Sequence, residues 1–292
     1  MARILLTGNR GFFGTRFHDI HGEDHEIVGI DKDDLDIVDE NSVARFVEDL
    51  RPQLVIHAAA ITATAFSDDN PELTRRINVD GAVNVAQAAK GVGAKLIFFS
   101  TEQVFNGNSD PGPYSEEDVP VPDTMYGKTK LEAETRLKEI LEELWILRFT
   151  WLFGLPERAR PVNPNILWNA LQIALKGSRE RVVVHEYRGH TYGYDMIQAV
   201  MQVPRIPYGT YHIGSRNDLG RYELTRCILK ELGFSEQRID NLVEPDSEKY
   251  SQRHRDLRLT TDKLTAAGIT FEETSTALTR AIGEFGLLGA AG

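Results

Sequence analysis

The stretch TGNRGFFG, residues 7–14, places glycines at positions 8, 11 and 14 directly after the apolar run ARILLT. A turn that brings backbone N–H groups against a phosphate leaves no room for a Cβ atom, and the N-terminus of a following helix favours negative charge. Because the loop lies between a predicted strand and a helix predicted to begin near Phe12, we interpret it as a dinucleotide-binding loop. The residues expected to contact the dinucleotide here are Gly8, Arg10, Gly11, Phe12, Phe13 and Gly14.

Outward from this loop, short apolar runs alternate with amphipathic segments. The runs are ARILLT, HEIVGI, QLVIHA, KLIFFS and LWILRF, all within residues 2–149, and helical patterns cover 40–50, 72–90 and 125–143. Runs that are apolar over most of their length suit strands buried on both faces of a parallel sheet. The alternation predicts an α/β protein with a Rossmann-type, doubly wound parallel sheet.

A second, smaller α/β region is expected after Gly154. The segment PERARPVNPN has three prolines within nine residues and precedes an apolar helix pattern that starts near Ile166. GTYHIG, residues 209–214, reads as one more strand, and helical patterns follow at 221–232 and 272–285. We expect residues 1–154 with about 191–214 to form a dinucleotide-binding domain, and about 155–190 with 215–292 to form a substrate-binding region.

Composition narrows the class of partner. The 292 residues contain 33 Lys and Arg against 44 Asp and Glu, a net charge of −11, so neither nucleic acid nor an anionic membrane is an expected partner. Cys227 is the only cysteine, which suits a reducing compartment. The apolar run at the N-terminus is too short for a signal peptide, and no stretch has the length of a membrane span. We expect a cytoplasmic protein.

The end of the second predicted strand bears on the choice of cofactor. Asp31 stands 17 residues after Gly14, near the spacing of a carboxylate that accepts from the adenosine ribose hydroxyls, which favours NAD. Arg10 and Lys32 are able to bind a 2′-phosphate, which favours NADP. Both NAD(H) and NADP(H) therefore stay open as cofactors.

The segment YGKTK, residues 126–130, contains the expected reaction centre. Tyr126 and Lys130 are four residues apart on a predicted helix and so share a face, whereas Lys128 points elsewhere. An adjacent ammonium is expected to stabilise the phenolate and lower the pKa of Tyr126 toward neutrality. The alternative is the polar first turn of a surface helix. The position of the segment in the chain favours a catalytic role for Tyr126 and Lys130. The preceding strand KLIFFS is followed by Thr101 at the carboxyl edge, where such sheets bind ligands.

These motifs resemble those of the extended short-chain dehydrogenase/reductases, and within them the dTDP-4-dehydrorhamnose reductases. The matching text includes RPQLVIHAAAIT (51–62), STEQVFNG (100–107), PYSEEDVPVPDTMYGKTKLEAE (113–134) and LRFTWLFG (147–154). The resemblance implies an NAD(P)H-dependent oxidoreductase that passes hydride to the keto carbon of a nucleotide-linked sugar, with Tyr126 as proton donor. It also implies a homodimer.

The resemblance assigns further residues. The implied catalytic group is Thr101, Tyr126 and Lys130. Tyr126 and Lys130 are also expected to contact the cofactor, Lys130 at the nicotinamide ribose. Asp36 and Ile37 are expected beside the adenine, Ala58, Ala59 and Ala60 along the cofactor, and Asn78 behind the lysine through water. The expected substrate contacts are Thr101, Glu102, Trp151 and Arg253, with Arg255 as an alternative to Arg253. Trp151 equally suits a core aromatic.

Some sugar-facing positions depart from the family pattern. Glu102, Gln103 and Asn106 stand where the reductases usually have an aspartate, a tyrosine and another aspartate. Two alternatives therefore stay open: a non-catalytic, dinucleotide-binding subunit similar to the β subunit of methionine adenosyltransferase, and a nucleotide-sugar epimerase or dehydratase. No metal site is expected, because His185, Glu186 and His190 lack the spacing of a ligand set.

Overall fold

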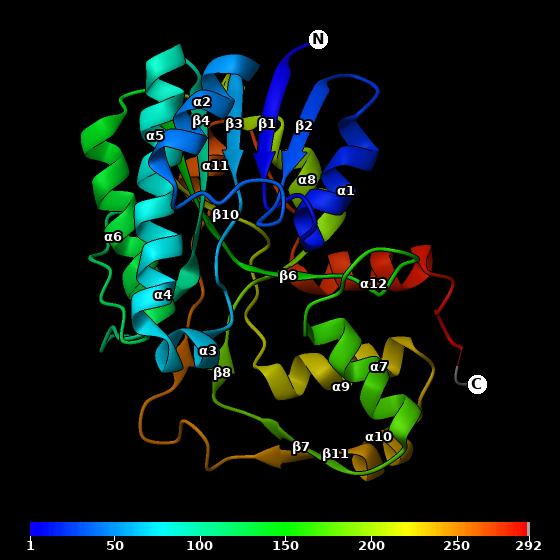
Figure 1. Cartoon of the computed structure of the whole chain (residues 1–292). Helices are drawn as coiled ribbons and strands as arrows, with labels where there is room; N and C mark the ends of the chain where they lie inside the picture. The colour runs from blue at the N-terminus through cyan, green and yellow to red at the C-terminus, as the bar shows by residue number, and fades with distance from the viewer. Residues whose placement is uncertain (291–292) are drawn as a thin grey trace.

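The parallel sheet expected from the sequence is present. The computed structural model describes residues 1–290, and six parallel strands form one sheet in the order β10-β5-β4-β3-β1-β2 (Figure 1). The strands are β1 Arg3–Thr7, β2 Glu26–Ile30, β3 Leu54–His57, β4 Lys95–Thr101, β5 Leu144–Phe149 and β10 Gly209–Ile213. Each falls on a predicted apolar run, so the doubly wound α/β fold is confirmed.

Helices cover both faces of this sheet (Figure 1). One face packs on α2 (Glu40–Leu50), α5 (Gly81–Val92) and α6 (Met125–Ile140), and the other on α1 (Phe12–His21), α8 (Gly193–Val200) and α11 (Asp262–Ala266). Successive strand residues point to opposite faces, so Phe98 of β4 packs with the α5 layer and Phe99 with the α1 layer. This double burial explains why the strands are mainly apolar.

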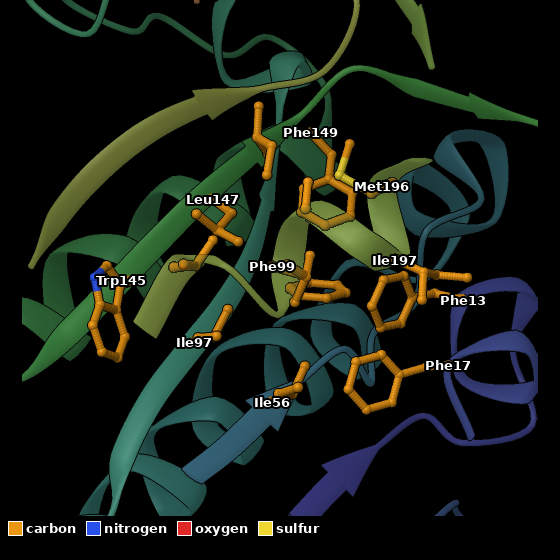
Figure 2. Close-up of a cluster of buried hydrophobic side chains, with 14 of the residues drawn as sticks. Phe13, Phe17, Ile56, Ile97, Phe99, Trp145, Leu147, Phe149, Met196 and Ile197 are labelled. Atoms are coloured by element: carbon orange, nitrogen blue, oxygen red, sulfur yellow. The ribbon is translucent and has the colours of Figure 1, made fainter. Parts of the chain in front are cut away.

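An aromatic cluster fixes the helix that follows the glycine loop. Phe13 of α1 meets Phe99 edge-to-face with ring centroids 4.8 Å apart, and Phe99 meets Phe149 of β5 at 4.4 Å. Phe17 and Met196 belong to the same cluster (Figure 2). Since α1 is anchored to β4 and β5 in this way, the N-terminus of α1 is held at the carboxyl edge of the sheet.

The predicted helix over 72–90 is interrupted. The segment consists of α4 (Pro71–Arg75), a π-helical turn η1 (Arg76–Asp80) and α5, and it follows a short helix α3 (Thr64–Asp69). A π-helical turn contains one more residue than an α-helical turn and is frequent at functional sites. The amphipathic pattern alone does not reveal it.

A second region lies beyond the carboxyl edge of the sheet (Figure 1). Its helices are α7 Ile166–Lys176, α9 Arg221–Glu231, α10 Glu236–Leu242 and α12 Thr274–Glu284, which share one apolar core. Three parallel strand pairs accompany them: β6 (Trp151–Phe153) with β9 (His190–Tyr192), β7 (Glu180–Val183) with β11 (Val243–Asp246), and β8 (Glu186–Tyr187) with β12 (Arg255–Asp256). The remaining elements are the 3₁₀ turns η2 (Glu102–Phe105) and η3 (Val203–Arg205).

The chain crosses between the two regions several times. Leu264 and Ile269 pack in the core beside the sheet, although they follow the segment assigned to the substrate-binding region. The division at residues 154, 191 and 214 stays a prediction. Within residues 1–290, no helix combines the length and the apolar character that crossing a bilayer requires.

Candidate active site

One cavity of about 900 Å³ lies at the carboxyl edge of the sheet, between the sheet and the second region. Most of the residues selected from the sequence line it: Gly8, Gly11, Phe12, Phe13, Asp31, Asp36, Ile37, Ala58, Ala59, Ala60, Thr101, Glu102, Tyr126, Lys130 and Trp151. Four selected residues, Arg10, Gly14, Asn78 and Arg253, are not part of its wall. The sequence thus brings segments from the whole first half of the chain to one site.

The glycine loop is closely packed against its neighbours. Gly8 has a left-handed backbone with φ of +76°, and a Cβ atom there would lie 2.9 Å from the backbone nitrogen of Ala59. Gly14 is required for packing rather than for lining the cavity, because its Cβ would lie 2.6 Å from the backbone of Asn9. No side chain caps the N-terminus of α1, which begins at Phe12. The first-turn N–H groups are therefore available to an anion.

Asp31 lines the cavity, and its carboxylate is held by two backbone N–H groups. Its two carboxylate oxygens accept from the backbone N–H of Arg10 at 3.0 Å and of Lys32 at 2.9 Å. The Arg10 guanidinium turns to Asp33, at 2.6 Å, and to Asp34, at 3.0 Å. The arginine that the sequence offered for a 2′-phosphate is thus engaged by two acids outside the cavity wall.

Asn78 lies behind the cavity and holds the loop after β3. Its side-chain oxygen accepts from the N–H of Ile61 at 2.8 Å, and its Nδ2 donates to the carbonyl of Ile61 at 2.9 Å and to Thr129 Oγ1 at 3.2 Å. Thr129 neighbours Lys130 on α6. Asn78 therefore links the segment after Ala58–Ala60 to the helix that contains the tyrosine and the lysine.

Thr101, Tyr126 and Lys130 all line the cavity. Thr124 caps α6 by accepting from the N–H of Gly127 at 3.3 Å, which sets Tyr126 in the first turn. Burial raises the pKa of Tyr126 to about 12, and its hydrogen bond with Thr101 opposes this shift only in part. Burial also lowers the pKa of Lys130 to about 7, and its Nζ donates to the carbonyl of Phe99 at 2.7 Å.

The expectation that Lys130 lowers the pKa of Tyr126 is wrong for this geometry. Desolvation of the phenol outweighs its hydrogen bond with Thr101, and the charge of Glu102 raises the pKa of Tyr126 further. Tyr126 is therefore protonated at neutral pH. That state is the one a proton donor needs.

A buried ion pair behind Lys130 escaped the sequence analysis. Glu134 accepts from Arg148 Nε at 3.0 Å and Nη2 at 2.7 Å, and from Ser100 Oγ at 2.5 Å. Its charge counteracts the fall in the pKa of Lys130. The signal was present in the sequence, since Glu134 follows Lys130 by one helical turn and so shares its face.

Five charged residues line one side of the cavity and are here called the charged wall: Glu102, Glu186, Arg188, Arg221 and Arg255. Arg188 lies 3.1 Å from Glu102 and 3.0 Å from Glu186, and Arg221 lies 3.0 Å from Glu186. Although burial alone raises the pKa of Glu186, the three arginines together lower it to about 2.

Of the predicted substrate contacts, Trp151 lies against the charged wall and Arg253 does not. Trp151 lines the cavity, with the Arg188 guanidinium 4.7 Å from its ring centroid. Arg253 lies outside the cavity and donates to the carbonyl of Asn106 at 3.1 Å, whereas Arg255 lines the cavity and donates to Gln103 at 3.1 Å. The sequence analysis did not select Arg188 or Arg221, because Glu102 is distant from Arg188 in the chain and Glu186 is distant from Arg221.

The profile of a protein family described as RmlD substrate binding domain matches residues 2–286. The chain belongs to this family. The expectation of an extended short-chain dehydrogenase/reductase similar to the dTDP-4-dehydrorhamnose reductases is confirmed. So is that of an NAD(P)-dependent oxidoreductase of this type.

Several known proteins are similar to this chain over most of their length. The chain is 27% identical over 280 residues to methionine adenosyltransferase 2 subunit beta of Pongo abelii, covering 91% of this chain and 83% of that protein. A dTDP-4-dehydrorhamnose reductase from Bacillus anthracis, solved in complex with NADP, superposes with a TM-score of 0.86 at 27% identity, over 97% of this chain and 99% of that one. Its counterpart from Clostridium acetobutylicum gives 0.85 at 28% identity, over 97% and 99%.

Proposed function

We propose that the protein is an NAD(P)H-dependent reductase of a keto group on a nucleotide-linked sugar. The observation that carries this proposal is that Thr101, Tyr126 and Lys130 line the same cavity as Gly8 and Gly11 of the glycine loop. The similarity to dTDP-4-dehydrorhamnose reductases, one of them solved with NADP, supports the same class of reaction.

The residues of the cavity fit a nicotinamide dinucleotide. Gly8 and the uncapped start of α1 leave backbone N–H groups and space for a diphosphate. Asp31, already aligned by two backbone N–H groups, has lone pairs for ribose hydroxyls. A 2′-phosphate would approach this carboxylate while Arg10 is engaged by Asp33 and Asp34. The arrangement therefore favours NAD(H) over NADP(H).

Each side chain of the site has its own role in the proposed reaction. The bound reduced nicotinamide supplies a hydride to the keto carbon. Tyr126, protonated because burial raises its pKa to about 12, donates a proton to the oxygen of the former carbonyl. The Thr101 hydroxyl donates a hydrogen bond to the same oxygen. Lys130 places a positive charge beside this centre, and the carbonyl of Phe99 fixes its Nζ.

The test is a titration of the purified protein with NADH and NADPH by fluorescence, followed by turnover of 4-keto nucleotide sugars measured as loss of reduced-cofactor absorbance. Tyr126→Phe is expected to lower kcat by about 100-fold to 10,000-fold, the usual contribution of a positioned general acid. Cofactor affinity is expected to stay unchanged. Tyr208→Phe is the matched control, since Tyr208 is exposed, does not line the cavity and donates its hydroxyl to Glu143 on the surface. Equal kcat in wild type and Tyr126→Phe would refute the mechanism.

A second candidate is a non-catalytic subunit that binds a dinucleotide and regulates a partner enzyme. The similarity to methionine adenosyltransferase 2 subunit beta over 91% of the chain favours it. Cofactor binding without turnover of any keto sugar would select this alternative.

A further inference from the structure

The segment between β6 and α7 lines part of the cavity and has little regular structure of its own (Figure 1). In residues 155–165, here called the strap, backbone pairing is limited to a turn between Glu157 and Arg160. Asn165 Nδ2 donates to the carbonyl of Gly154 at 2.9 Å, so the two ends of the strap lie together. Compact surface loops whose ends meet in this way are frequently functional.

The strap lies against the first turn of α1, where the diphosphate of the cofactor is proposed to bind. Arg16 Nη1 donates to the carbonyl of Phe12 at 2.9 Å and to that of Pro161 at 3.2 Å, and its Nη2 donates to the carbonyl of Leu155 at 3.2 Å. One guanidinium thus joins the start of α1 to the strap. The cavity wall includes three consecutive strap residues, Asn163, Pro164 and Asn165.

Ion pairs attach the outer part of the strap. Glu157 accepts from Arg16 Nε at 2.8 Å and from the Tyr194 hydroxyl at 2.7 Å, and Arg160 pairs with Glu157 and with Asp19 of α1. The side chains of Arg160 and Asp19 are 30% and 49% exposed, whereas that of Arg16 is 1% exposed. Water and salt therefore weaken the Arg160–Asp19 pair, here called the latch, but not the buried anchor Arg16.

We propose that the strap is a lid over the bound dinucleotide and that the latch limits the rate at which the dinucleotide leaves. The inference rests on the cofactor binding of the proposed function. Three prolines restrict rotation within the strap, so it is expected to swing as one piece about its joined ends. A reductase releases oxidised cofactor in every turnover, and lid opening is a common limit on that step.

The experiment measures the release of NADH directly. Protein loaded with NADH is mixed with an excess of NAD⁺ in a stopped-flow instrument, and the loss of NADH fluorescence gives the dissociation rate. In Arg160→Ala this rate is expected to rise at least about fivefold. Asp19→Asn is expected to raise it similarly, and the double variant to release no faster than Arg160→Ala, because both changes break one pair.

Arg226→Ala is the matched control. The Arg226 side chain is 25% exposed, pairs with Glu236 at 2.8 Å and with Asp240 at 2.7 Å, and does not line the cavity. Its replacement is expected to leave the release rate within about twofold of the wild type, because these pairs lie outside the strap. Added salt is expected to speed release more in the wild type than in Arg160→Ala, which has already lost the latch.

Trypsin provides a second measurement that needs no variant. Arg158 is exposed within the strap, and cleavage after it requires the strap to open. NADH is expected to slow this cleavage in the wild type at least about threefold, because bound dinucleotide favours the closed strap.

Equal release rates in the wild type and Arg160→Ala overturn the inference and leave the reductase proposal standing. If Arg160→Ala does not fold, cleavage after Arg158 that NADH leaves unchanged overturns it. Faster release in Arg160→Ala without turnover of any keto sugar supports the lid and counts against the reductase. Wild-type protein that binds neither NADH nor NADPH removes the proposed function, and this inference with it.

Discussion

Replacing Glu134 by glutamine tests the buried ion pair behind the reaction centre. Glu134 is 1% exposed and Arg148 is 4% exposed, and the carboxylate accepts two hydrogen bonds from the guanidinium, at 3.0 and 2.7 Å. The glutamine keeps the shape of the side chain but leaves Arg148 as an uncompensated buried cation. Removing one partner of such a pair costs about 3–5 kcal/mol. We expect the free energy of unfolding of Glu134→Gln to fall by about 3 kcal/mol or more.

Urea denaturation followed by circular dichroism measures this loss. The control is Glu132→Gln on the same helix, because Glu132 pairs with Arg75 at 2.5 Å but both side chains are more than a third exposed, at 37% and 42%. Exposed pairs contribute less than about 1 kcal/mol, so the control is expected to unfold at nearly the wild-type urea concentration. Equal slopes in the three proteins would show that the same surface unfolds. A loss below about 1 kcal/mol in Glu134→Gln would refute the reasoning.

Three further predictions concern pH, cofactor and loop. Burial lowers the pKa of Lys130 to about 7, so kcat/KM for reduction is expected to fall as pH rises through neutrality. Because the charge of Glu134 raises the pKa of Lys130, the fall in kcat/KM is expected at lower pH in Glu134→Gln. A flat pH profile would contradict this. In Asp31→Ser, the ratio of the KM values for NADPH and NADH should drop at least about tenfold, near 1.4 kcal/mol, and an unchanged ratio counts against a role in cofactor choice. Arg16, 1% exposed, donates to three backbone carbonyls, two of them in 155–165. Arg16→Leu should speed proteolysis of that segment, unlike the exposed Arg45→Leu.

The sheet was predictable because its signal is local. Helices cover both faces of the sheet, so most strand residues are buried and the strands give short, mainly apolar runs in the sequence, from ARILLT to GTYHIG. The glycine loop was predictable for the same reason, because a single turn brings Gly8 and α1 together. The pair Tyr126 and Lys130 follows from helical spacing alone.

The rest of the site depends on contacts between distant segments. Arg188 meets Glu102 only because β9 lies beside β6, beyond the edge of the main sheet. The pKa of Tyr126 depends on how deeply the phenol is buried, which no spacing rule provides, and so its direction was predicted wrongly. Arg10 was selected for its place in the loop, but Asp33 and Asp34 determine where its guanidinium points.

The π-helical turn at Arg76–Asp80 is the place where this helical segment is able to lose a residue. The turn contains one residue more than an α-helical turn, so deleting one residue other than Asn78 would restore a regular α-helix while α4 and α5 keep their faces. Asn78 itself is required, because it bonds Ile61 and Thr129. A deletion within α5 would instead rotate everything that follows by about 100° and turn its buried alanines away from the sheet, so it is expected to be far less tolerated than a deletion in the turn.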